Sequence, residues 1–170
     1  MTADSRLASF GLHGQVESIG LLSSRPNRRF NWWPLQGSEE GEMPLARISL
    51  REGTTEEYRK GIADGVHQAM IDALGIPPKD RFQVISEYKA GGLIYDAEYL
   101  DIKRSDMIVF VQITLSTGRK PGQKRALFAR MAELLGKSPG VRPEDLLVNL
   151  VEVSWENWSF GKGEAQYQKD

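Results

Sequence analysis

The sequence lacks cysteine altogether and contains only two histidines, His13 and His67, among its 170 residues. The absence of cysteine excludes disulfide bonds, thiolate catalysis and cysteine ligands to a metal. Two histidines alone do not complete a zinc site, so we expect no metal site. His67 lies in a stretch with helical spacing, where we interpret it as part of the structure or of the surface.

An excess of charge of either sign is missing as well. Lysine and arginine number 22 and aspartate and glutamate 23, whereas a nucleic-acid-binding protein typically carries a basic excess. No apolar run approaches the roughly 20 residues that span a bilayer. Polar residues and glycines from Ser9 to Gly14 interrupt the apolar stretch that a signal peptide needs. With 40% hydrophobic residues, we expect a soluble, cytoplasmic, globular protein without a nucleic-acid or membrane partner.

Residues 1–42 lack a sustained helical or strand period. One interpretation of residues 1–43 is a flexible leader, and another is a recognition arm or lid that carries Trp32 and Trp33. We favour a third, a misplaced start codon. Residues 37–42 read Gly-Ser-Glu-Glu-Gly-Glu before Met43, and Glu-Glu-Gly can be encoded by GAGGAGGG, a purine-rich stretch typical of a ribosome-binding site. The folded domain is therefore expected to begin at Pro44.

The first folded unit is expected in residues 44–88. Residues 45–50 alternate between two unlike faces, which indicates a strand. Thr54 as N-cap and Glu57 as the capping-box acid predict the start of an amphipathic helix. Gly75, followed by two prolines, predicts its end. Residues 81–88 alternate again, and a crossover of this length favours parallel strands.

The unit is then repeated at an offset of 65 residues. The matching pairs fall at turns, caps and strand positions: Ile48 with Ile113, Leu50 with Leu115, Gly53 with Gly118, Gly75 with Gly140, Pro78 with Pro143, Asp80 with Asp145, and Glu87 with Glu152. The second unit, residues 107–153, is predicted to contain strands at 107–115 and 146–153 and a helix with Pro121 in its first turn. Residues 89–106 are expected to connect the units as a loop or short edge strand, and 154–170 to form a C-terminal tail.

Two β-α-β units predict an α/β domain in which a four-stranded sheet carries two helices on one face. The other face of the sheet then needs cover, which favours an oligomer.

The duplication fails at two chemically informative positions. Val109 stands where the first unit has Pro44, and Arg119 stands where the first unit has Thr54. If residues 1–43 are removed, Pro44 becomes a secondary amine that can take and return a proton, whereas within a chain its nitrogen is an inert amide. Arg119 can hold an anion, although an exposed arginine in a turn is more commonly a solvated charge.

Several segments together resemble the tautomerase superfamily: Met43-Pro44 before a strand, Gly53-Thr54-Thr55, residues 75–83 (GIPPKDRFQ), Thr117-Gly118-Arg119, Val151-Glu152, and residues 157–161 (NWSFG). Within that superfamily the chain is most similar to the malonate semialdehyde decarboxylase-like group of fused 4-oxalocrotonate tautomerase-like proteins. The resemblance covers residues 44 to about 167. It implies the fold of macrophage migration inhibitory factor (MIF) and its relatives, a homotrimer, and chemistry without a cofactor.

The resemblance also assigns roles to single residues. Pro44 matches the catalytic proline, Asp80 its acidic partner, and Arg119 an arginine that binds the substrate carboxylate. Trp158, Phe160 and Tyr167 match aromatic positions that wall the pocket. Thr117 departs from the pattern, because the decarboxylase has a second arginine there. From the sequence, Asp80 is equally well a turn residue, and the aromatic side chains equally well cover the sheet or a subunit contact.

These residues predict a keto-enol tautomerase that acts on a small 2-oxo acid similar to phenylenolpyruvate. An α-amino group titrates near ~7.7 to 8.0, and burial beside a cation favours the neutral amine that accepts a proton. If Asp80 instead raises the pKa of the amine, the same proline acts as an acid in decarboxylation or hydration of a 3-oxo or halo-acrylate acid. If residues 1–43 are retained, the chain is expected to be a catalytically silent binding or assembly protein.

Overall fold

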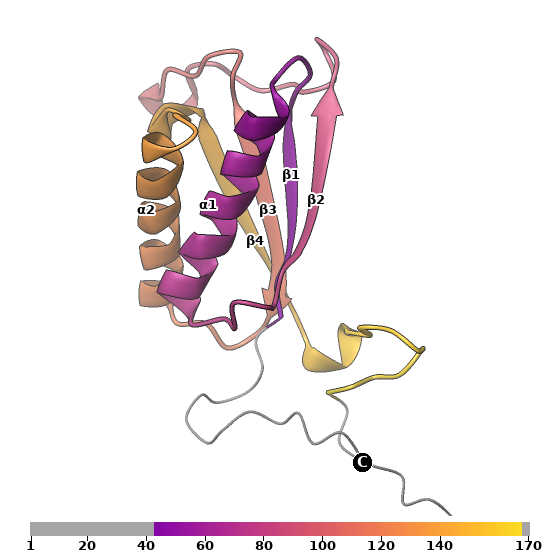
Figure 1. Ribbon diagram of the computed structural model, residues 1–170. Helices are drawn as coiled ribbons and strands as arrows, with labels where there is room; N and C mark the ends of the chain where they lie inside the picture. The colour runs from indigo at the N-terminus through magenta and orange to yellow at the C-terminus, as the bar shows by residue number, and fades with distance from the viewer. Residues whose placement is uncertain (1–42, 168–170) are drawn as a thin grey trace, which may run out of the picture. The chain divides into compact units, whose positions relative to one another are not determined.

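Four strands form one mixed sheet in the computed structural model, which describes residues 43–167 (Figure 1). The strands are β1 (Leu45–Arg51), β2 (Phe82–Tyr88), β3 (Val109–Ser116) and β4 (Leu146–Val153), in the order β2-β1-β3-β4. β1 is parallel to β2, β3 is parallel to β4, and β1 and β3 are antiparallel. Each copy of the repeat thus supplies one parallel pair, which confirms the predicted tandem β-α-β units.

Helices α1 (Glu56–Leu74) and α2 (Pro121–Lys137) cover the same face of this sheet (Figure 1). The side chains of Ala46, Ile48 and Leu50 point toward the helices and are at most 2% exposed. Burying each large apolar side chain contributes about 1.5–3 kcal/mol. The core consists of such side chains from both units: Ala46, Ile48, Leu50, Ile62, Val66, Met70, Val111, Ile113, Leu115, Leu127, Met131 and Leu135. Residues 46–141 therefore supply the buried core.

The start of α1 differs from the prediction by one residue. Thr55, not Thr54, is the N-cap, and its Oγ1 accepts a hydrogen bond of 3.1 Å from the backbone N–H of Tyr58. Thr54 instead donates to a side chain of β2. Because the cap moves, Glu57 does not occupy the capping-box position. The predicted end of the helix is confirmed, since Gly75 adopts a left-handed conformation with φ 74°.

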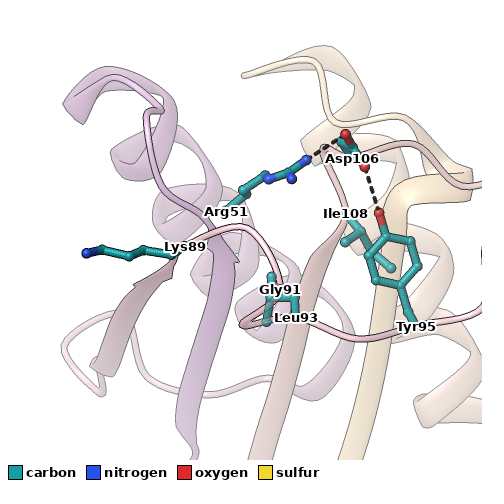
Figure 2. Close-up of a pocket in the computed structure, with 7 residues that line it drawn as sticks. All are labelled: Arg51, Lys89, Gly91, Leu93, Tyr95, Asp106 and Ile108. Atoms are coloured by element: carbon teal, nitrogen blue, oxygen red, sulfur yellow. Dashed lines mark hydrogen bonds and ion pairs between the residues drawn. The ribbon is translucent and has the colours of Figure 1, made fainter.

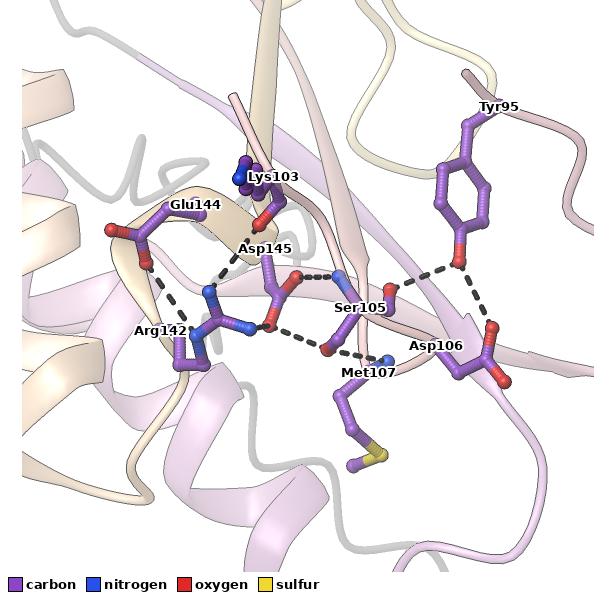
Figure 3. Close-up of polar contacts among 8 residues, drawn as sticks. All are labelled: Tyr95, Lys103, Ser105, Asp106, Met107, Arg142, Glu144 and Asp145. Carbon is purple, nitrogen blue, oxygen red and sulfur yellow. Dashed lines mark hydrogen bonds and ion pairs between the residues drawn. The ribbon is translucent and has the colours of Figure 1, made fainter. Parts of the chain in front are cut away.

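Residues 89–106 form a loop with one short 3₁₀ turn, Tyr99–Asp101, and no edge strand. Asp145 fastens this loop to the second unit (Figure 3). Its carboxylate accepts hydrogen bonds from the backbone N–H of Ser105 at 2.6 Å and from the Ser105 hydroxyl at 2.7 Å. Asp145 is only 1% exposed, so its charge is buried but hydrogen-bonded.

The second face of the sheet carries no helix within residues 43–167. Large apolar side chains on this face remain substantially exposed: Phe82, Val84, Tyr88, Leu147 and Val151, at 36% to 45%. The structure thus shows the uncovered face that the sequence predicted. No helix in this part of the chain is long and apolar enough to cross a membrane.

His67 has a structural position, as expected. It is 7% exposed, and its Nε2 lies 3.0 Å from the carbonyl oxygen of Pro78, beyond the end of α1. The predictions for His13, Trp32, Trp33 and the leader fall on residues 1–42, outside the described residues.

Candidate active site

Four chain segments meet at one end of the sheet. β1 begins directly after Pro44 and β2 shortly after Asp80, whereas β3 ends just before the turn that carries Arg119. β4 ends at Val153, where the C-terminal tail begins. Because β1 and β2 run antiparallel to β3 and β4, the starts of the first pair and the ends of the second pair share an edge (Figure 1). The fold therefore gathers residues that are distant in the sequence.

Pro44 is buried at this edge and is joined to Met43 by an ordinary amide bond. Its neighbour Leu45 is the register partner of Phe82 in β2 and of Thr114 in β3. Pro44 therefore precedes the first paired residue of the central strand β1, between β2 and β3. The nitrogen of Pro44 therefore lies between β2 and β3.

Asp80 is a buried carboxyl group without a hydrogen-bond partner. It is 5% exposed, and neither side-chain oxygen is bonded within the described residues. Burial raises the pKa of Asp80 to about 7. Its backbone N–H makes the turn, donating to the carbonyl of Pro77 at 2.9 Å. The turn thus uses the backbone of Asp80 and leaves its side chain available to a ligand.

Arg119 is buried as well, at 8% exposure, and is therefore not a solvated turn charge. Its Nη1 donates a 3.0 Å hydrogen bond to the carbonyl oxygen of Leu74, the last residue of α1. A guanidinium at a helix C-terminus is favourable because it neutralises the negative end of the helix dipole. This bond holds the cation at the edge where Pro44 and Asp80 lie.

The tail forms an aromatic cluster at the same edge. Phe160 stacks on Trp158 with ring centroids 5.4 Å apart, and lies 5.6 Å from Tyr167 and 5.9 Å from Phe82. Gln166 fixes this arrangement, since its amide accepts from the backbone of Phe160 and donates to the next carbonyl. The contact with Phe82 docks the tail onto the start of β2.

Tyr167 links the aromatic cluster to the carboxyl group. Burial raises the pKa of Tyr167, and the nearby charge of Asp80 raises it further. The phenol therefore remains a neutral hydrogen-bond donor near Asp80. The indole Nε1 of Trp158 is also buried and lacks a partner within residues 43–167. The cluster accordingly offers donors as well as apolar surface.

Thr117, predicted to contact substrate, has an exposed side chain. Its backbone N–H donates to the carbonyl of Val153 at 3.0 Å, which ties β3 to the end of β4. The neighbouring residue, Ser116, was not predicted from the sequence to belong to the site. It is 3% exposed, and its hydroxyl has no partner among the described residues. A small polar residue at the end of an apolar strand was the only signal for it.

No group of three or more metal-ligating side chains occurs within residues 43–167.

A small pocket lies at the opposite end of the sheet (Figure 2), lined by Arg51, Lys89, Gly91, Leu93, Tyr95, Asp106 and Ile108. Two of its three charged residues bind each other, because the Arg51 guanidinium lies 2.6 Å from the carboxylate of Asp106. The buried carboxyl and guanidinium groups of the first edge are thus the stronger candidate for chemistry.

Comparison with known proteins identifies the family of the chain. Two family models described as tautomerase enzymes match residues 44–103 and 80–161. The probable tautomerase YusQ of Bacillus subtilis (strain 168) is 37% identical over 124 residues, which are 73% of this chain and 98% of YusQ. The match therefore spans almost the whole of YusQ, whose length is close to that of the described domain.

Solved structures show the same fold. A malonate semialdehyde decarboxylase, with decarboxylase and hydratase activities, has a TM-score of 0.68 at 34% identity and covers 72% of this chain and 94% of its own. A fused 4-OT protein that forms a symmetric trimer has a TM-score of 0.59 at 20% identity, over 71% of this chain and 94% of its own. The MIF-like fold expected from the sequence is thereby confirmed.

Proposed function

Because the chain belongs to the tautomerase family, we propose that its domain of residues 44–170 catalyses keto-enol tautomerisation of a small 2-oxo acid. The observation that carries this proposal is the buried carboxyl group of Asp80, which has no hydrogen-bond partner within the described residues and lies at the end of the sheet where β1 begins. The proposal is also supported by a buried proline and a buried arginine at the same end of the sheet, which we assign as the base and the anion-binding group.

In the active form Pro44 is the N-terminal residue and its nitrogen is a secondary amine. The α-amino group of a peptide titrates near ~7.7 to 8.0. Burial under the aromatic cluster and the positive charge of Arg119 both favour the neutral amine, whereas an ionised Asp80 favours the ammonium. The amine accepts the enol O–H proton while the oxygen forms the carbonyl, and then returns the proton to C3 of the substrate. Positioned proton transfer of this kind contributes roughly 10²- to 10⁴-fold.

The other residues bind and orient the substrate. Arg119 receives the carboxylate, with Nη1 anchored on α1. Trp158, Phe160 and Tyr167 exclude water and pack against an apolar or aryl substituent, which suits a phenylenolpyruvate-like substrate. Thr117, at the mouth of the site, is a lesser substrate contact because its side chain is exposed. The reaction needs no cofactor.

A second candidate function is decarboxylation or hydration of a 3-oxo or halo-acrylate acid by the same proline. The observation that favours it is the 34% identity to a malonate semialdehyde decarboxylase. In this mechanism Asp80 ionises, raises the pKa of the Pro44 amine and makes the ammonium the proton donor. A chain that retains residues 1–43 has no such amine and would be a catalytically silent binding protein.

We further propose that the active protein is a homotrimer. The support is the face of the sheet without a helix, with five large apolar side chains at 36% to 45% exposure, together with the symmetric trimer formed by a fused 4-OT of the same fold.

The test is ketonisation of phenylenolpyruvate by a chain that begins at Pro44. We expect catalysis by this chain, a loss of at least about 10²-fold in the specificity constant with Pro44→Ala, and little activity in the chain of 170 residues. Equal rates for wild type and Pro44→Ala would reject Pro44 as the base. Decarboxylation of a 3-oxo acid without ketonisation would favour the second candidate.

A further inference from the structure

Ser116 and Asp80 flank the position of residue 43 from opposite sides. In the sheet, Leu45 pairs with Phe82 of β2 and with Thr114 of β3. When this register is extended by two residues, the position of Met43 lies beside Asp80 in the parallel direction and beside Ser116 in the antiparallel direction. Since side chains alternate along a strand, Ser116 lies on the same face of the sheet as Thr114.

Both flanking side chains are buried and lack partners. Ser116 is 3% exposed and Asp80 is 5% exposed, and neither the Ser116 hydroxyl nor the Asp80 carboxyl group is hydrogen-bonded within residues 43–167. Buried polar groups in proteins are nearly always paired, so two orphans around one position need an explanation.

The second copy of the repeat serves as an internal control. There Ile108 occupies the position equivalent to residue 43, between Asp145 and Arg51, which correspond to Asp80 and Ser116. Asp145 accepts two hydrogen bonds from Ser105 (Figure 3), and Arg51 pairs with a carboxylate (Figure 2). Both positions are occupied in the structure, by Met43 and Ile108, but only the groups that flank Ile108 have partners, whereas Asp80 and Ser116 lack them within residues 43–167.

We infer that Ser116 is a positioning residue for the amine of Pro44, an inference that rests on the proposed function. When the chain begins at Pro44, residue 43 is absent and the nitrogen that was bonded to it faces the vacated position. The hydroxyl oxygen of Ser116 accepts an N–H of this amine from the side opposite Asp80. The neutral amine has one N–H and one lone pair, so a bond to Ser116 leaves the lone pair for the substrate.

The bond to Ser116 also stabilises the ammonium form, because hydrogen bonds that involve a charged donor are stronger than neutral ones. Three other groups at this edge act on the amine. Asp80, when ionised, favours the ammonium, Arg119 opposes it, and the Tyr167 phenol stays neutral because burial and Asp80 raise its pKa. Removal of the Ser116 hydroxyl should therefore lower the pKa of the amine.

The experiment is an NMR titration of the ¹⁵N-labelled Pro44 amine in the chain that begins at Pro44, which needs no substrate. This chain holds the complete core and has nearly the length of YusQ. Ser116→Ala should lower the amine pKa by about half a unit and reduce kcat about tenfold with little change in KM. Ser116→Thr, which keeps a hydroxyl, should retain both values.

Thr114→Ala, on the same face of β3, is the matched control and should change neither value. An amine pKa and a kcat in Ser116→Ala equal to those of wild type would overturn the inference. If wild type does not ketonise phenylenolpyruvate while Ser116→Ala still lowers the amine pKa, the tautomerase proposal fails and the positioning role stands.

Discussion

Asp80 and Asp145 are the same residue in two copies of one repeat, yet they have opposite environments. Asp145 is 1% exposed and bonded to Ser105, whereas Asp80 is 5% exposed and has no partner within the described domain. A buried carboxyl group without a partner destabilises the folded state when it is charged. Such a cost at one copy alone is typical of a functional site.

The first prediction concerns the pH dependence of stability. The pKa of Asp80 is raised to about 7 by burial, above ~3.9 in the unfolded chain. Between these two values the folded state binds more protons, so Asp80 lowers stability as the pH rises from 4 to 7. Asp80→Asn should therefore raise the free energy of unfolding at pH 8, on the order of 1 kcal/mol after allowance for water penetration.

Urea unfolding at pH 4 and pH 8 measures this effect in the chain of 170 residues, in which the nitrogen of Pro44 is an uncharged amide. The gain from Asp80→Asn should nearly vanish at pH 4, where the wild-type carboxyl group is neutral in the folded state. A loss of stability at pH 8 would show that the carboxylate has a stabilising partner.

Arg119→Ala tests the anion-binding role. The variant should raise KM for phenylenolpyruvate about tenfold or more with a smaller change in kcat, because it removes a charged hydrogen-bond donor to the carboxylate. Arg125→Ala, an exposed arginine of α2, serves as the control. If Arg119→Ala and wild type have equal specificity constants, the guanidinium does not bind the substrate and its role is limited to the hydrogen bond at the C-terminus of α1.

Among the secondary-structure elements, α1 shows where sequence reasoning was inaccurate. Thr54 and Thr55 are both good N-caps, and the sequence placed Glu57 in a capping box with the first of them. The structure selects Thr55, because Thr54 is used in a contact with Glu87 of β2. A tertiary contact thus decided between two locally equivalent residues.

This difference is measurable. Thr55→Ala should lower the free energy of unfolding by about 0.5–2 kcal/mol, because the N–H of Tyr58 loses its acceptor. Thr54→Ala, the matched control one residue earlier, should cost less, since its partner Glu87 is exposed. Chemical denaturation of the two variants compares them, and a larger loss for Thr54→Ala would restore the N-cap predicted from the sequence.

The tail and the 89–106 connection were less accessible to sequence reasoning. The short edge strand considered for residues 89–106 does not form, because the backbone bonds of this segment are local, such as that from the N–H of Arg104 to the carbonyl of Ala97, and pair it with no strand of the sheet. Trp158, Phe160 and Tyr167 could be named from the family resemblance, but their contact with Phe82 required the structure. The place of Ser116 next to residue 43 was recognised only from the register of the strands in the structure.

For the whole domain, the sequence was sufficient to predict the fold. Period-two alternation, the helix end at Gly75 and the 65-residue repeat predicted the four strands, their parallel pairs and the placement of both helices on one face. These signals lie within short segments or recur along the chain, so they can be recognised without knowledge of tertiary contacts. The grouping of Pro44, Asp80 and Arg119 was implied by the family resemblance, whereas the burial and hydrogen bonding of each residue required the structure.

The open face of the sheet leads to a prediction about assembly. Light scattering of the chain that begins at Pro44 should give the mass of a trimer. Val84→Lys and Val151→Lys place charges among exposed apolar side chains and should yield smaller species, whereas Arg125→Ala, on the helical side, should not. A monomeric wild type at micromolar concentration would contradict the trimer.

The central claim is that the working protein begins with a free secondary amine at Pro44. Intact mass spectrometry with N-terminal sequencing of the protein from its native cells tests this most directly. The account predicts a chain whose first residue is Pro44, with an unmodified nitrogen. A mass for all 170 residues, or an acylated Pro44, would contradict it.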